Sequence, residues 1–271
     1  MIPRSNLHTH TTFSDGADRA ENVILSAIEM GMETLGFSDH SGLPFPTTWC
    51  MTPEARDAYH REINRLKAVY GDRIHILLGI EQDLCSGMPD FPYDYVIGSV
   101  HCLEVGEENY MVDESAEVLA KAAKQHYQGD YYRMCRHYYE QVAKVVETTG
   151  CDMVGHFDLI TKFNEGGRLF DEQDPRYLRP AVEALDYLLE KDVIFEINTG
   201  AISRGYRRSP YPSTMLLRRI AEKRGRVTLT SDSHAKESLL CSFDAAAHLA
   251  RASGIGSLYV MTRDGWRAYP L

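Results

Sequence analysis

The sequence predicts an α/β fold, a barrel of about seven β/α units. Short apolar runs of strand length alternate with longer segments whose apolar residues recur at helical spacing. The strand-like runs are nearly continuous in apolar residues, which is typical of parallel strands covered on both faces. Polar residues, many of them histidines, follow these runs directly. In β/α barrels the carboxyl ends of all strands meet at one rim, where active sites are built.

The expected elements follow one another along the chain. Strands are expected at residues 5–8, 34–39, 74–81, 95–101, 152–156, 193–198 and 227–232. An eighth apolar run at 257–262 either closes the sheet or lies outside it. Helices are expected within 20–32, 53–70, 130–150, 176–191, 213–225 and 242–254. Three of these segments end in glycine, a common residue at the end of helices.

The length of 271 residues suits one large α/β domain, and we expect residues 1–271 to form it. Residues 103–132 are the exception to the regular alternation. This segment is long and acidic, and it is expected to be either an insertion or a lid over the rim. A solvated acidic loop is the alternative.

Composition excludes several classes of function. The net charge is −10 and the isoelectric point about 5.6, whereas proteins that bind nucleic acid or anionic membranes normally present a basic face. The sequence has no apolar run long enough to span a membrane and no secretory signal at its start, so we expect a cytoplasmic protein. The six cysteines form no C-x-x-C pair and are expected to be reduced core residues.

Histidines are concentrated at the expected strand ends. His8 and His10 are two residues apart, so they point to the same side of a strand and can reach one ion. Asp232 and His234 repeat this spacing near the other end of the chain. Nine candidate ligands would meet at the rim: His8, His10, Asp15, His40, Glu81, His101, His156, Asp232 and His234.

So many buried titratable groups require a compensating charge. Imidazole and carboxylate groups suit Zn, Fe or Mn, and nine ligands suit two or three such ions rather than one. Gly16 follows Asp15 and is expected to let that loop turn tightly. Asp39, Glu196 and Asn198 also lie at strand ends but are not assigned a role.

The motifs HTHTTFSDG, FSDHS, GIEQD, IGSVH, VGHFD and TSDSH resemble, in this order, those of the PHP (polymerase and histidinol phosphatase) superfamily. Further stretches, GHFDLITKFN and EINTGAISRGYRRSPYPS, resemble its monofunctional histidinol-phosphate phosphatases. The resemblance implies a distorted (β/α)7 barrel with three metal ions at the carboxyl rim. It implies that His8, His10, Glu81 and Asp232 hold the first ion. Glu81 would bridge to a second ion, held also by His101 and His156, while Asp15, His40 and His234 would hold the third.

The resemblance also implies a reaction, the hydrolysis of L-histidinol phosphate to L-histidinol and phosphate in histidine biosynthesis. A hydroxide that bridges two metal ions would attack phosphorus. Glu81 would hold those ions together, and Asp232 or His234 would assist proton movement. No other partner is expected beyond this small phosphate monoester, and the oligomeric state is left open.

Cations just beyond strand ends are expected to meet the rest of the phosphate charge. Lys162 and Arg204 are placed near the phosphate by the resemblance, and Arg207 is a third candidate. Lysine is a point charge and cannot form the bidentate fork of arginine. In the acidic segment, Asp113 or Glu114 is a candidate to pair with the ammonium group of an amino-alcohol phosphate.

Two other functions are weighed against this one. The first is a phosphoesterase of the same superfamily that acts on nucleotides or short oligonucleotides, which would require a basic track with stacking aromatic residues. The second is a metal-bound module without catalytic activity. The acidic net charge disfavours the first, and the complete ligand set disfavours the second.

Overall fold

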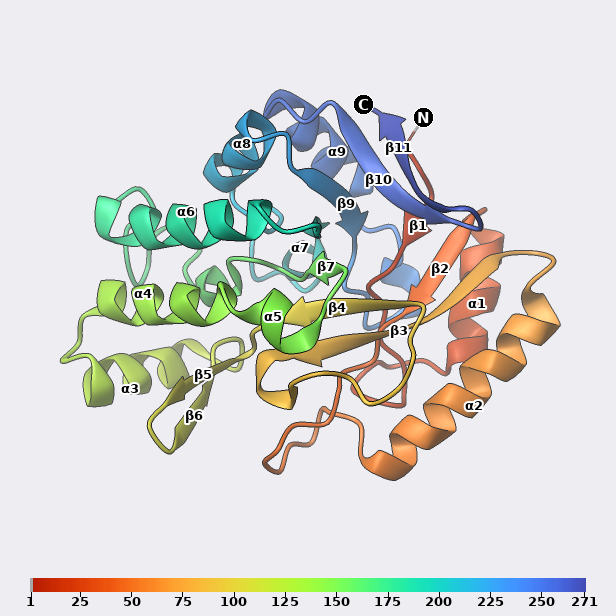
Figure 1. Cartoon of the computed structure of the whole chain (residues 1–271), viewed down its shortest axis with the longest axis horizontal. Coiled ribbons are helices and arrows are strands. Elements are labelled where there is room, and N and C mark those ends of the chain that lie inside the picture. The colour runs from red at the N-terminus through yellow and green to blue at the C-terminus, as the bar shows by residue number, and fades with distance from the viewer. Residues whose placement is uncertain (1) are drawn as a thin grey trace.

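A computed structural model describes residues 2–271 and contains seven parallel strands in a nearly closed barrel (Figure 1). The predicted fold class is therefore confirmed. The strands follow chain order around the barrel: β1 (Ser5–Asn6), β2 (Thr34–Phe37), β3 (His75–Asp83), β4 (Tyr95–Ser99), β7 (Met153–Val154), β8 (Ile194–Asn198) and β9 (Arg226–Thr230). The predicted strand positions correspond to these seven, although β1 and β7 are only two residues long.

The barrel closes at its rim rather than along its full height. Strands β1 and β9 are the two ends of the sheet. Just beyond them, the N–H of His10 donates to the carbonyl of Ser233 (2.8 Å), and the N–H of Ser233 donates to the carbonyl of His8 (3.0 Å). These bonds place the segments with His8, His10, Asp232 and His234 side by side, although they are more than 220 residues apart in the sequence.

One aromatic side chain lies among the buried apolar residues inside the barrel, below the rim. Tyr95 of β4 is buried, and its hydroxyl donates to the carbonyl oxygens of Leu7 and Phe37. A Cβ on Gly36 would lie 2.3 Å from the hydroxyl oxygen of Tyr95, and a Cβ on Gly79 would lie 2.3 Å from its ring. Glycine in these two strands thus gives the ring its space.

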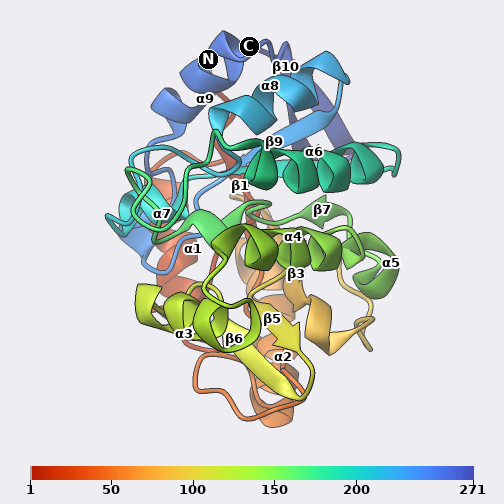
Figure 2. The same cartoon turned by 90° about the vertical axis from the view of Figure 1, so that its left-hand side faces the viewer.

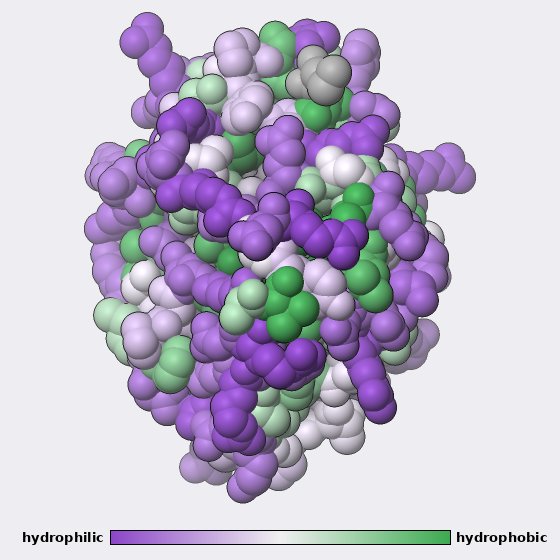
Figure 3. Space-filling model, turned by 90° about the vertical axis from the view of Figure 1, so that its right-hand side faces the viewer, coloured by the Kyte–Doolittle hydropathy of each residue, from purple (hydrophilic) through white to green (hydrophobic). Residues whose placement is uncertain are grey.

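Helices cover the outside of the barrel (Figures 1 and 2). They are α1 (Ala20–Glu29), α2 (Pro53–Tyr70), α4 (Tyr131–Val142), α5 (Val145–Thr149), α6 (Pro175–Leu189), α8 (Thr214–Glu222) and α9 (Phe243–Ala252). The short helix α7 (Gly200–Ser203) instead follows β8 at the rim, beside Asp232. Helix α2 begins at Pro53 because the Thr52 side chain accepts from the N–H of Ala55 and proline suits the first position of a helix. The side of the molecule where α1 and α2 lie is mostly hydrophilic, with small separate apolar groups (Figure 3). No helix among residues 2–271 is long and apolar enough to cross a bilayer.

The apolar run at 257–262 lies outside the barrel sheet. It forms β10 (Ser257–Thr262), which pairs antiparallel with β11 (Gly265–Pro270). Side chains of this hairpin, including Tyr259 and Trp266, pack against the apolar cluster that contains Tyr95. The hairpin therefore covers part of the barrel interior without adding a strand.

Residues 103–132 have regular structure that the sequence patterns did not predict. Strands β5 (Cys102–Val105) and β6 (Glu108–Met111) form a hairpin, and helix α3 (Ala116–His126) follows. Leu119, Ala122 and Ala123 bury one face of this helix, while its other face is polar. That the segment moves as a lid stays a prediction. The expected helix at 130–150 is divided into α4 and α5, with the break at Ala143–Lys144.

Candidate metal centre

The nine predicted ligand residues lie together at the carboxyl rim of the barrel. Each comes from the end of a strand or from the loop after it, as the alternation of strands and helices predicted. Asp232 has a positive φ of 45°, which is uncommon for a residue other than glycine but is tolerated by aspartate. Gly16 is also needed, since a Cβ there would lie 2.5 Å from the backbone of His10.

A first group consists of His8, His10, Glu81 and Asp232. The Nε2 atom of His8 lies 3.2 Å from Glu81 Oε2 and 3.7 Å from Asp232 Oδ1. The Nε2 atom of His10 lies 3.6 Å and 3.2 Å from the same two oxygens. Two nitrogens and two carboxylate oxygens thus face one small space, a donor set that suits a transition-metal ion.

The other carboxylate oxygen of Glu81 belongs to a second group. Glu81 Oε1 lies 2.9 Å from His156 Nε2 and 3.4 Å from His101 Nε2. The hydroxyl of Ser99 donates to the same oxygen (2.7 Å), which fixes the carboxylate plane. One carboxylate therefore faces two groups of imidazoles, as a bridging ligand does.

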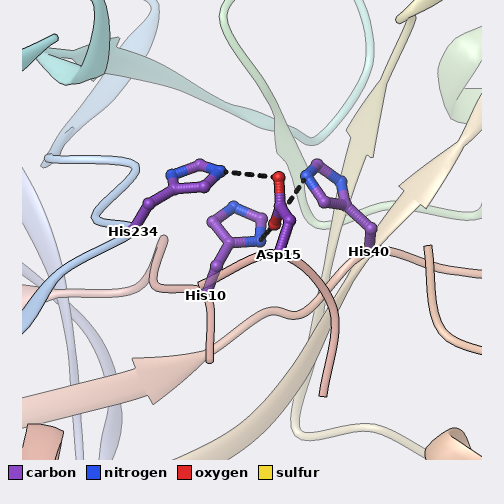
Figure 4. Close-up of side chains that lie close together, drawn as sticks. All are labelled: His10, Asp15, His40 and His234. Carbon is purple, nitrogen blue, oxygen red and sulfur yellow. Dashed lines mark ion pairs between the residues drawn. The ribbon is translucent and has the colours of Figure 1, made fainter. Parts of the chain in front are cut away.

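A third group surrounds Asp15 (Figure 4). Its Oδ1 atom lies 3.6 Å from His40 Nε2, and its Oδ2 atom lies 3.2 Å from His234 Nε2. His10 also reaches this group, with Nδ1 3.7 Å from Asp15 Oδ1. His40 likewise faces two groups, because its Nδ1 lies 2.8 Å from Glu81 Oε2. The family resemblance assigned His10 and His40 to one ion each and did not indicate these second contacts.

Unpaired buried atoms in these groups fit bound metal ions. Nε2 of His8, both ring nitrogens of His10 and Oε2 of Glu81 are buried and make no hydrogen bond within the described part of the chain. Buried polar atoms are normally satisfied, and leaving one unpaired costs about 1–3 kcal/mol. Coordination of metal ions would satisfy Nε2 of His8, Oε2 of Glu81 and one ring nitrogen of His10, while the other nitrogen of a neutral His10 carries the proton.

The pKa values of the two histidines of the first strand move in opposite directions. Burial lowers the pKa of His8, but the carboxylates of Glu196 and Glu81 outweigh it and raise that pKa well above its ordinary value. Burial and the neighbouring ring of His234 lower the pKa of His10 to about 3. His10 is thus a neutral ligand at physiological pH, whereas metal binding at His8 would displace a proton.

Three further carboxylates hold the predicted ligands in place. Glu196 is fully buried, and its Oε1 lies 2.6 Å from Nδ1 of His8. Asp83 accepts from the main-chain N–H of His101 (2.9 Å), and Asp39 accepts from the N–H groups of Thr11 and Ser14, which shape the loop before Asp15. The sequence contained a signal for these three residues. Asp39 and Asp83 lie one and two residues from a predicted ligand, and Glu196 lies near the end of an apolar strand. Carboxylates that orient metal-binding histidines commonly tune metal affinity.

A cavity of about 750 Å³ opens beside these groups. Two predicted phosphate-binding cations, Lys162 and Arg204, line it. Arg204 donates to Asp232 Oδ2 (2.9 Å) and lies 2.9 Å from Nδ1 of His234. Lys162 donates to the carbonyl of Asp113 (2.8 Å), and its Nζ lies 3.3 Å from Asp113 Oδ2.

Arg207, the third predicted phosphate-binding cation, has other partners. Its guanidinium is buried, donates to the carbonyl of Thr161 (2.6 Å) and pairs with Glu172 (3.1 Å). It is not among the residues that line the cavity. The geometry thus favours Lys162 and Arg204 over Arg207 for contact with a phosphate group.

Comparison with known proteins supports this picture. The PHP domain family matches residues 6–200. A protein named "probable histidinol-phosphatase" from Deinococcus radiodurans is 31% identical over a region that covers 77% of each chain. A protein of the same name from Schizosaccharomyces pombe is 28% identical over 90% of this chain and 84% of its own chain. The crystal structure of histidinol phosphate phosphatase from Lactococcus lactis subsp. lactis, complexed with Zn, L-histidinol and phosphate, has the same fold. Its TM-score is 0.73 and its identity 24%, with 98% of this chain and all of that chain covered. This chain therefore belongs to the PHP domain family.

Proposed function

We propose that this chain is a metal-dependent phosphatase that hydrolyses L-histidinol phosphate to L-histidinol and phosphate. The observation that carries the proposal is Glu81, a fully buried carboxylate whose two oxygens each face imidazoles of a separate group. The relatives named histidinol-phosphatase, and the complex of one of them with L-histidinol and phosphate, support the choice of substrate.

The residues present fit two or three ions of Zn, Fe or Mn. His8, His10, Glu81 and Asp232 would hold one, Glu81 would share a second with His101 and His156, and Asp15, His40 and His234 would hold a third. When bound, such ions supply Lewis-acid polarisation of a phosphoryl group and lower the pKa of bound water.

The other residues would bind and orient the phosphate group. Arg204 faces the cavity from the side of Asp232, and its guanidinium suits charge-assisted hydrogen bonds to an oxyanion. Lys162 adds a second positive charge in the same cavity. Asp232 and His234 are the two candidates to move the proton to the leaving alcohol. Both lie beside Arg204, which would bind the phosphate group, so both would lie near the reacting ester.

Phosphate release is the direct test. The protein is stripped with a chelator, reloaded with Zn²⁺, Mn²⁺ or Fe²⁺, and given L-histidinol phosphate, AMP or a generic aryl phosphate in parallel. We expect metal-dependent turnover with the highest kcat/KM for L-histidinol phosphate, and two to three ions per chain by elemental analysis. Preference for AMP would indicate a nucleotide phosphoesterase, and no turnover with any ester would indicate a module without catalytic activity.

Glu81→Gln provides the matching variant. The amide keeps the shape of the side chain but loses the charge and one acceptor oxygen, so the two groups that share Glu81 are no longer linked. We expect turnover to be abolished and bound metal to fall while the circular dichroism spectrum is unchanged. Glu183→Gln is the control, because Glu183 is exposed on α6 and far in the sequence from every candidate ligand. Near-normal kcat in Glu81→Gln would refute the bridging role.

A further inference from the structure

The two cations that line the 750 Å³ cavity belong to loops that follow neighbouring strands. Lys162 lies in the loop after β7 and Arg204 in the loop after β8, and these two strands pair with each other. A phosphate group that meets both cations requires the two loops to keep a fixed separation, because charge-assisted hydrogen bonds depend steeply on geometry. The contacts between the two loops therefore bear on phosphate binding.

Arg207 joins these two loops. It lies three residues after Arg204, and its guanidinium donates to the carbonyl of Thr161 (2.6 Å), the residue before Lys162. The same guanidinium reaches both carboxylate oxygens of Glu172, at 3.1 and 3.3 Å. Arg207 thus ties the loop of Arg204 to the main chain next to Lys162, although it does not line the cavity itself.

Glu172 is anchored in turn to the loop after β7. The side-chain amide of Asn164 donates to Oε1 of Glu172 (2.9 Å) and to the carbonyl of Phe170 (3.0 Å). Asn164 is fully buried, and the side chain of Arg207 is only 7% exposed. Water has little access to this pair, so the loss of one partner would leave the other charge buried without compensation. The link between the loops is therefore directional and costly to break.

The residue before Arg207 contacts Lys162 directly. The Nζ atom of Lys162 lies 4.9 Å from the ring centre of Tyr206, and this ring meets that of Phe163 edge-on at 5.5 Å. Tyr206 also lines the cavity. A shift of Arg207 would move the adjacent Tyr206, and with it the ring face beside the ammonium group of Lys162.

We propose that Arg207 is a positioning residue for phosphate binding, which acts through Lys162 by fixing the loop of Lys162 to the loop of Arg204. Its partner Glu172 completes the link. This inference rests on the proposed phosphatase function and deepens it, because it assigns the arrangement of the phosphate-binding cations to a buried ion pair outside the cavity.

Arg207→Lys is the first test, because lysine keeps the charge but cannot reproduce the planar fork that serves Thr161 and Glu172 together. In the metal-loaded protein, we expect the inhibition constant of inorganic phosphate and the KM for L-histidinol phosphate to rise about threefold to tenfold. The kcat should stay within about twofold and the metal content should be unchanged. A role in folding alone would reduce the fraction of active protein, which lowers kcat and leaves both constants at their wild-type values. That outcome would overturn the proposal.

Two more variants support this comparison. If circular dichroism shows that Arg207→Lys is unfolded, Glu172→Gln provides the same test, because it keeps the shape of the side chain and removes the charge that holds Arg207. Arg219→Lys is the matched control. Arg219 forms a similar two-pronged pair with Asp186 (2.8 and 2.6 Å), but it joins α8 to α6 and does not line the cavity. Its constants should equal those of the wild type.

A double variant tests whether Arg207 acts through Lys162. Lys162→Met removes the cation whose position is at issue. Adding Arg207→Lys to this variant should then change the inhibition constant of phosphate by less than twofold, because the effects of coupled residues do not add. If the two substitutions weakened phosphate binding independently, the proposal would be wrong.

A binding measurement separates this inference from the proposed function. Calorimetric titration of the metal-loaded protein with inorganic phosphate requires no turnover. Weaker phosphate binding in Arg207→Lys would support the positioning role even if no ester were hydrolysed. Binding within twofold of the wild type would overturn it, whereas phosphate release by the wild-type protein would still stand as evidence for the phosphatase.

Discussion

Glu196→Gln tests whether a carboxylate outside the ligand set controls the metal centre. Oε1 of Glu196 lies 2.6 Å from Nδ1 of His8, and both side chains are fully buried. Its Oε2 accepts from the main-chain N–H of His156 (2.9 Å) and from the amide of Asn198 (3.1 Å). The variant is isosteric, so any effect comes from charge and hydrogen bonding rather than from volume.

The expected loss of metal affinity follows from the three groups that Glu196 accepts from: Nδ1 of His8, the main-chain N–H of His156 and the amide of Asn198. A glutamine has one acceptor oxygen, and if this oxygen keeps the two bonds at the Oε2 position, its NH₂ group faces Nδ1 of His8. Nδ1 must then act as an acceptor, so the proton of a neutral His8 moves to Nε2, the nitrogen that faces Glu81 at 3.2 Å. A metal ion would have to displace that proton. Loss of one buried charge-assisted hydrogen bond corresponds to about 1.5–3 kcal/mol, or roughly a tenfold to hundredfold loss of metal affinity.

The assay is competition between the protein and a chromogenic chelator for Zn²⁺, with kcat/KM for L-histidinol phosphate measured at saturating metal. We expect the dissociation constant to rise by the stated factor and activity to recover largely when metal is in excess. Glu183→Gln on the exposed face of α6 serves as the control and should bind metal as the wild type does. A metal affinity of Glu196→Gln within twofold of the wild type would refute the reasoning.

Two further variants test the cavity and the barrel. Arg204→Ala should lower kcat/KM for L-histidinol phosphate about tenfold to a hundredfold, through both KM and kcat, because it removes a charged donor beside Asp232. Steady-state kinetics would check this, and a change below twofold would remove Arg204 from the phosphate site. Gly79→Ala should lower the free energy of unfolding in urea by about 1–3 kcal/mol, because the new Cβ would lie 2.3 Å from the ring of Tyr95. An unchanged midpoint would contradict the packing argument.

The ligand set could be predicted from the sequence because its signals are local. His8 and His10 are two residues apart at the end of one strand, and Asp232 and His234 repeat the pattern. Parallel strands bring their carboxyl ends to one rim, so no long-range contact had to be known in advance. The second contacts of His10 depend on the ring orientation and on the distance between β1 and its neighbours, which the sequence does not encode locally.

Other parts of the molecule could not be predicted, because they depend on contacts between distant residues or have only a weak local pattern. The role of Glu196 depends on its distance from His8, which is 188 residues away in the sequence. The partner of Arg207 is Glu172, in a loop with no distinctive motif. In α3 only Leu119 and small alanines bury the inner face, so the apolar pattern of this helix was weak and residues 103–132 resembled an irregular acidic segment.

The packing below the rim and the candidate metal centre depend on the same strand register. Gly79 and Glu81 are two residues apart in β3, so both lie on the face of the strand that is turned into the barrel, with Gly79 one layer below Glu81. At the lower level the ring of Tyr95 occupies the space left by Gly79, and its hydroxyl bonds to the carbonyl of Leu7, the residue before His8. A slip of β3 by one residue would put a side chain against this ring and turn Glu81 away from the histidines. The contact between Tyr95 and Gly79 therefore helps to set the position of the carboxylate on which the proposed chemistry depends.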